Sequence, residues 1–182
     1  MNTRDLSYIA LSVALISVSA WIALPFGNIP VTMQTAVICL IAGLLGTKRA
    51  IFAVFTYILL GAIGAPIFAG FTGGVTKLVA PTGGYIIGFL CIAITVGIVS
   101  DLTKKVSRGQ WIYLAAAMTL GIILCYVLGT VWFVFLTVQN GNLFSVWSAL
   151  TLCVFPYLPF DVAKIVLAVC LTMKLKKIIK TV

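Results

Sequence analysis

The sequence predicts an all-α membrane protein, a single domain over residues 1–182 built as a bundle of six transmembrane helices. Of its 182 residues, 63% are hydrophobic and 8% are charged, whereas soluble globular domains carry about 25% charged residues. At roughly 20 apolar residues per span, a chain of this length has room for about six spans and no sizeable soluble domain. The basic residues also gather in alternate connections between the apolar runs.

Six apolar runs separated by proline, glycine and charged residues define the expected helices. They cover about residues 6–24, 33–47, 50–65, 83–100, 111–137 and 148–173. The first run follows Arg4, as the core of a signal peptide would, but it ends at residues 24–27 without a small-residue cleavage pattern. We therefore expect a retained helix. Pro156 and Pro159 interrupt the start of the last run.

Most basic residues lie in the connections that six helices would place on one side of a membrane. Ten of the twelve do so: Arg4; Lys48 and Arg49; Lys104, Lys105 and Arg108; and Lys174, Lys176, Lys177 and Lys180. Because basic residues in short loops stay on the cytoplasmic side, we expect both termini in the cytoplasm and the protein in the cell membrane. Lys77 and Lys164 are the exceptions and need another explanation.

The connections on the opposite side are rich in glycine, proline, asparagine and aromatic residues. They are residues 25–32, 66–82 and 138–147. Residues 66–74 form a long connection for a compact bundle, with enough glycine to close over a ligand. A re-entrant or flexible loop without a ligand is the alternative, and Lys77 is then a solvated loop lysine.

Two ionisable residues, Asp161 and Lys164, lie inside the last apolar run. Counted back from Lys174, Lys164 stands about 15 Å and Asp161 about 20 Å into a hydrocarbon region about 30 Å thick. Each such charge costs about 2.5 to 3.5 kcal/mol on insertion scales, so it usually faces the bundle interior or a cavity. A spacing of three places both on one helix face, and Pro159 suits the first turn. The pair is a candidate binding site; the alternative is a structural ion pair that binds nothing.

The chain offers little to an enzyme. It has no His and no Glu, and Asp5 and Asp101 fall in expected cytoplasmic segments, so no catalytic set or metal site can be assembled. It has no GxxxxGK[ST] phosphate loop, so ATP-driven transport would need another subunit. Basic residues set between apolar runs argue against nucleic-acid binding. The five cysteines lie singly in apolar stretches, and we expect all five to be buried.

Small residues on the first expected helix could admit a neighbouring helix. Ala10, Ala14 and Ser17 fall along one face at spacings of four and three, which permits close helix approach. Gly84 and Gly88 offer a similar surface on the fourth expected helix. Packing inside the bundle is the alternative for both sets.

Five short segments together indicate a protein family, because all five match its pattern in the same order along the chain. They are Ile29–Thr35, Gly61–Phe71, Pro81–Tyr85, Gly129–Phe133 and Pro159–Lys164. With them the sequence resembles, along almost its whole length, the BioY family of biotin-binding S components of energy-coupling factor (ECF) vitamin transporters. Ala80 departs from the glycine expected there, and Lys77 is also unusual.

The resemblance implies that biotin enters from outside and binds near the outer ends of helices four to six. It implies that Asp161 accepts a ureido N–H and that Lys164 donates to a biotin oxygen, either of the carboxylate or of the ureido carbonyl. Further expected lining residues are Gln34, Phe71, Gly73 and Tyr85. The resemblance also implies that Ala10 and Ala14 contact a transmembrane T component. Two ATPase subunits would complete the complex, and no cofactor is expected.

Other functions stay open from the sequence. An S component for another vitamin would share the bundle and the contact on the first helix but differ in the pocket. A stand-alone secondary carrier would use Asp161 to bind a proton and would need no ATPase. An intramembrane enzyme has few residues to build on.

Overall fold

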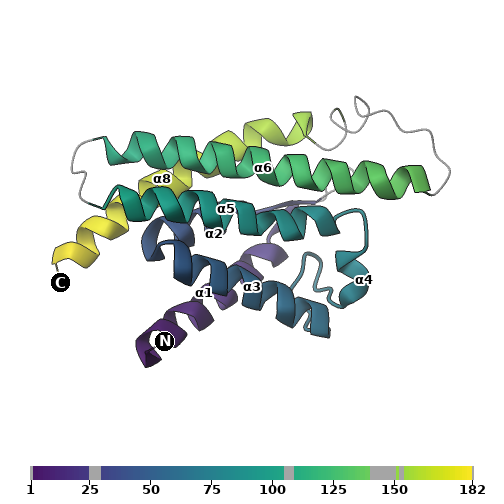
Figure 1. The fold of residues 1–182 in the computed structure, drawn as a ribbon, viewed down its shortest axis with the longest axis horizontal. Helices are drawn as coiled ribbons and strands as arrows, with labels where there is room; N and C mark the ends of the chain where they lie inside the picture. The colour runs from purple at the N-terminus through teal and green to yellow at the C-terminus, as the bar shows by residue number, and fades with distance from the viewer. Residues whose placement is uncertain (1, 25–29, 105–108, 140–150, 152–153, 182) are drawn as a thin grey trace.

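The computed structural model describes residues 2–24, 30–104, 109–139, 151 and 154–181. The long helices are α1 (Thr3–Trp21), α2 (Gln34–Leu45), α3 (Thr47–Ile63), α5 (Gly83–Leu102), α6 (Gln110–Gln139) and α8 (Leu158–Thr181) (Figure 1). Two short helical elements are α4 (Val75–Leu78) and the 3-10 turn η1 (Phe155–Tyr157). The two-residue strands β1 (Ala23–Leu24) and β2 (Val31–Thr32) pair antiparallel. The expectation of a mostly helical chain is confirmed.

The first five long helices begin and end within about three residues of their expected bounds, but the last one does not. It was expected from residue 148, and α8 begins at Leu158 after a 3-10 turn that contains Pro156. Pro159 then lies in the first turn of α8, where its missing amide hydrogen breaks no helical hydrogen bond. Residues 148–150, 152 and 153 lie outside the described residues. Neither α4 nor the strand pair was predicted.

Helix α5 is central to the bundle, packing against α6, α3 and α2, while α2 also packs against α8 (Figure 1). Glycines let α5 and α6 approach closely, because a methyl group on Gly84 would clash with Trp132 and one on Gly88 with Cys125. These two glycines therefore serve packing inside the bundle. The same close approach brings Tyr85 of α5 and Tyr126 of α6 edge to face, with ring centroids 6.2 Å apart.

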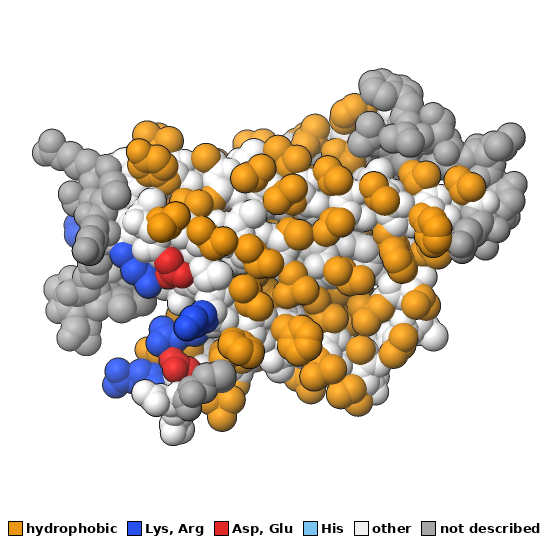
Figure 2. All heavy atoms as spheres, viewed as in Figure 1, with side chains coloured by type: hydrophobic (Ala, Val, Ile, Leu, Met, Phe, Trp, Pro, Cys, Tyr) orange, Lys and Arg blue, Asp and Glu red, His pale blue; other side chains and the backbone are white. Residues whose placement is uncertain are grey.

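Charged side chains gather at one end of the bundle, where the N- and C-terminal ends of the chain also lie (Figures 1 and 2). Arg49 at the start of α3 pairs with Asp5 of α1 at 2.6 Å. The carboxylate of Asp101, at the end of α5, accepts hydrogen bonds from the backbone and hydroxyl of Thr47 at 2.9 and 2.6 Å. These contacts join the ends of three helices.

The remaining described surface in Figure 2 is largely apolar. Large hydrophobic side chains are exposed along α1, α3, α5, α6 and α8, including Leu11, Phe55, Ile98 and Val131. Among the described residues, α5 and α6 are the two helices long and apolar enough by themselves to cross a membrane. Six spans therefore remain a prediction.

The cysteines differ from the sequence expectation. Cys39 and Cys125 are buried, but Cys91 is half-buried and Cys170 is exposed. Cys170 lies on the outward face of α8, where apolar residues need not be covered by the chain itself if lipid covers them. Cys153 lies outside the described residues.

Candidate functional site

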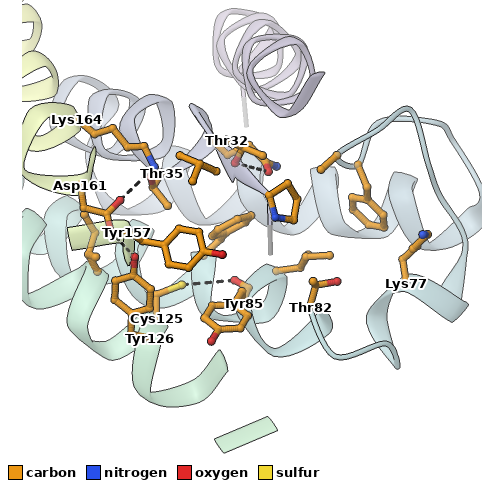
Figure 3. A pocket seen from close by; sticks show the side chains of 18 of the residues that line it. Thr32, Thr35, Lys77, Thr82, Tyr85, Cys125, Tyr126, Tyr157, Asp161 and Lys164 are labelled. Carbon is orange, nitrogen blue, oxygen red and sulfur yellow. Dashed lines mark hydrogen bonds and ion pairs between the residues drawn. The ribbon is translucent and has the colours of Figure 1, made fainter. Parts of the chain in front are cut away.

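A cavity of about 240 Å³ lies inside the bundle, between β2, the start of α2, α3, the α3–α4 connection, α5, α6 and the start of α8 (Figure 3). Its wall is mostly apolar and aromatic. The lining residues are Pro30, Val31, Thr32, Gln34, Thr35, Tyr57, Phe68, Ala69, Thr72, Lys77, Thr82, Tyr85, Ile86, Phe89, Ile122, Cys125, Tyr126, Tyr157, Asp161 and Lys164. Small-molecule sites share this character: an apolar enclosure with a few placed polar groups.

Asp161 and Lys164 form a buried ion pair in the cavity wall. Both come from the first two turns of α8, and the Lys164 ammonium lies 3.1 Å from Oδ1 of Asp161. The Tyr126 hydroxyl donates to the other carboxylate oxygen, Oδ2. An ammonium has three N–H donors, and within the described residues Asp161 engages one of them. The other two can serve a ligand.

Gln34 lies in the cavity wall and connects three segments of the chain. Its carbonyl oxygen accepts from the Thr32 hydroxyl at 3.0 Å, and its amide nitrogen donates to the Tyr57 hydroxyl at 2.7 Å. The Tyr57 hydroxyl in turn donates to the Ile67 carbonyl at 3.1 Å. This chain of hydrogen bonds fixes the start of α2 against α3 and against the α3–α4 connection. Gln34 therefore positions the wall and keeps one amide hydrogen for a ligand.

Tyr85 also lines the cavity. Its hydroxyl lies 3.3 Å from the Thr130 hydroxyl of α6. Gly129 makes room for the tyrosine ring, since a methyl group there would clash with it. The Gly129–Thr130 and Gly84–Tyr85 segments of the sequence thus act together to hold one aromatic side of the cavity.

Phe71 and Gly73 are not among the residues that line the cavity. Phe71 has 63% of its surface exposed, and its ring stacks on Trp21 of α1 with centroids 4.7 Å apart. Gly73 packs against the backbone of Gly64 and Ala65 so closely that a side chain would clash. In this arrangement both shape the α3–α4 connection, and direct ligand contact by either stays a prediction.

Sequence reasoning missed Thr35, Tyr126 and Tyr157 as lining residues. Thr35 is notable because its hydroxyl oxygen is buried and has no hydrogen-bond partner within the described part of the chain. Leaving a buried polar group unsatisfied costs about 1 to 3 kcal/mol, so a ligand in the cavity would supply a missing partner. The sequence did contain a signal for Thr35, because it places a hydroxyl residue directly after Gln34 at the start of an apolar run.

The small residues of α1 split between two faces. Ala10 and Ala14 are exposed, whereas Ser17 is buried and donates to the Val13 carbonyl at 2.8 Å. The exposed alanines leave the middle of α1 accessible to a neighbouring helix. Their contact with a partner stays a prediction.

A helical bundle with a cavity in its interior is typical of membrane proteins that bind a small molecule, and a solved structure shares this fold. The chain superposes with a TM-score of 0.83 on a solved structure described as the S-component for biotin from an ECF-type ABC transporter. The two sequences are 25% identical, and the match covers 97% of this chain and 95% of that one. No group of metal-ligating residues occurs among the described residues.

The BioY family model matches residues 1–181, and the chain belongs to the BioY family. It is 39% identical to the biotin transporter BioY of Thermotoga maritima, over 96% of this chain and 97% of the relative. It is 34% identical to the probable biotin transporter BioY of Pyrococcus horikoshii, over 97% of this chain and 98% of the relative. The predicted resemblance is confirmed. The family is one of transporters, so the protein is a membrane transport protein and not an enzyme.

Proposed function

We propose that this chain is the substrate-binding membrane subunit that captures biotin from outside the cell for ATP-dependent uptake by an ECF transporter. The observation that supports this most directly is the buried Asp161–Lys164 pair in the wall of an otherwise apolar cavity. Burying charges is costly unless they are paired. A buried ion pair in the wall of a cavity is best explained by a polar ligand that binds there.

The chemistry of biotin suits the groups in the wall. Its ureido ring presents two N–H donors and a carbonyl acceptor. Asp161 accepts from a ureido N–H, and the free N–H groups of Lys164 donate to the ureido carbonyl. The aromatic wall, including Tyr57, Phe89 and Tyr157, covers the thioether ring and the aliphatic chain. The ligand is the transported substrate, and no cofactor is required.

We propose six membrane crossings with both termini in the cytoplasm. The clustering of Arg49, Lys104 and Lys176 near the ends of α1, α3 and α5 supports this topology, because positive residues mark the cytoplasmic side. Helix α2 has 12 residues and rises about 18 Å, less than the hydrocarbon thickness of about 30 Å. The β2 segment before it would complete that crossing, inside protein rather than in lipid.

Uptake against a gradient would require partner subunits. The chain has no phosphate-binding loop, so ATP hydrolysis falls to two ATPase subunits, joined through a transmembrane T component. The exposed Ala10 and Ala14 on α1 offer a surface for that component, since small residues permit close helix contact in membranes. Copurification of the chain with T and ATPase subunits, lost in Ala10→Leu/Ala14→Leu, tests the partnership.

Biotin titration of the purified protein in nanodiscs tests the binding function. We expect Asp161→Asn and Lys164→Met each to raise Kd about 10- to 100-fold, because a hydrogen bond to a charged group contributes about 1.5 to 3 kcal/mol. Lys104→Met removes a charge at the charged end of the bundle, outside the cavity, and should leave Kd unchanged.

Three results would overturn the proposal. Wild-type Kd in the micromolar range or weaker, unaltered in both variants, would show that the pair binds nothing. Competition by thiamine or riboflavin but not biotin would assign another vitamin. Uptake into ATP-free proteoliposomes driven by a pH gradient would assign a secondary carrier.

A further inference from the structure

Lys77 is the one charged side chain besides Asp161 and Lys164 among the described residues of the cavity wall. It comes from the last turn of α4, in the long connection between α3 and α5. Lys77 and the ion pair lie at opposite ends of the view in Figure 3. Within the described residues, its side chain has neither an ion-pair nor a hydrogen-bond partner. It is therefore a half-buried cation that has no counter-ion in the described part of the chain.

The position of Lys77 is fixed at both ends of α4. The backbone N–H of Gly74 donates to the Gly61 carbonyl of α3 at 2.7 Å. At the end of α4, the Leu78 carbonyl packs directly on Gly83 of α5, and two residues further on the indole of Trp132 donates to the Ala80 carbonyl at 3.1 Å. A lysine on a segment held this way stays beside the cavity.

The wall thus has three zones in order: the ion pair, a middle that is mainly apolar and aromatic, and a lone cation. Tyr85 of α5 lies between the ion pair and Lys77 in Figure 3, and Ile86 and Phe89 of the same helix also line the cavity. A ligand that fits this order has a polar uncharged ring, an apolar chain and a terminal anion.

A carboxylate is poorly suited to the ion-pair end. The charge of Lys164 is already balanced by Asp161 at 3.1 Å, and a second carboxylate beside that one would suffer like-charge repulsion. At Lys77 the same carboxylate would meet an unbalanced cation. Charge-assisted N–H···O bonds are the stronger class of hydrogen bond.

We propose that Lys77 binds the carboxylate of the transported substrate, so that the ligand lies with its ring at Asp161–Lys164 and its acid tail toward α4. This rests on the proposed function and fixes the direction of the ligand. It also makes the protein selective for a free acid over its ester or amide.

Titration of biotin and biotin methyl ester, which share the ring and the chain, tests the orientation. Wild type should bind the acid about tenfold more tightly than the ester, as one hydrogen bond between charged groups allows. Lys77→Met should weaken acid binding about tenfold, leave ester binding unchanged and remove the preference. Lys77→Arg should retain the preference, and so should Lys174→Met, a matched charge loss outside the cavity.

Different outcomes separate the two proposals. If wild type binds neither the acid nor the ester, the biotin function itself fails. If wild type binds both and Lys77→Met keeps the preference for the acid, the role of Lys77 fails alone. Loss of the preference in Lys164→Met but not in Lys77→Met would place the carboxylate at the ion pair and overturn the orientation.

Discussion

Two ion pairs of the same kind lie in opposite surroundings, one at the charged end of the bundle and one in the wall of the cavity. At the charged end, the side chains of Lys104 and Asp101 are 63% and 37% exposed. In the cavity, those of Lys164 and Asp161 are 9% and 7% exposed. Both pairs join residues three positions apart in the chain. Spacing therefore says little about function, whereas burial in the wall of a cavity distinguishes the proposed binding pair from the surface pair.

The largest expected difference between the two pairs is in stability. Lys164→Met leaves the Asp161 carboxylate buried and unpaired, and breaking a buried pair this way costs about 3 to 5 kcal/mol. The double variant Asp161→Asn/Lys164→Met removes both charges and should recover most of the loss. Lys104→Met should cost less than about 1 kcal/mol, because exposed pairs contribute little. Thermal unfolding in nanodiscs measures all three.

If the double variant recovers stability but not biotin affinity, the pair serves binding rather than folding. If Lys164→Met and Lys104→Met lower the thermal midpoint equally, the buried and the exposed ion pair do not differ in their contribution to stability.

A smaller effect is expected from Tyr126, whose hydroxyl donates to Asp161. Tyr126→Phe removes one of the hydrogen bonds that hold the carboxylate and should weaken biotin binding about tenfold. Tyr113→Phe is the matched control, since Tyr113 lies on the same helix and is exposed. Calorimetric titration with biotin compares the two variants. Identical Kd values would show that the Tyr126 hydroxyl does not contribute to biotin binding.

The smallest effect is expected from Thr35. Thr35→Val removes a buried hydroxyl without a partner in the described chain, so the thermal midpoint should stay the same or rise. Biotin affinity should fall by up to about tenfold, while Thr35→Ser should retain it. A lower midpoint together with unaltered Kd in Thr35→Val would mean that the hydroxyl serves the fold alone.

The sequence alone predicts those features of the structure that depend on local residue patterns. Apolar runs located the long helices, and two charges inside one of them located the ion pair of the cavity. Pro159 marked the first turn of α8, but the run before it did not reveal that α8 begins at Leu158, because apolar residues suit a helix and a buried connection equally well.

What the sequence could not provide was the contact between distant segments. Tyr126 meets Asp161 across 35 positions of the chain, and in α6 it is one aromatic residue among many. Phe71 and Lys77 occupy one glycine-rich connection, yet Lys77 lines the cavity and Phe71 stacks on Trp21. Gly70, Phe71 and Gly74 of this connection all have positive φ, and the sequence pattern does not indicate how such turns direct the neighbouring side chains.

A structure of the intact protein with biotin bound in a nanodisc tests the central claim most directly. We predict the ureido ring at the start of α8, with an N–H within about 2.7 to 3.2 Å of Asp161 and the carbonyl at the same range from Lys164. Biotin bound outside the cavity, with Asp161 and Lys164 still paired only within the protein, would contradict it.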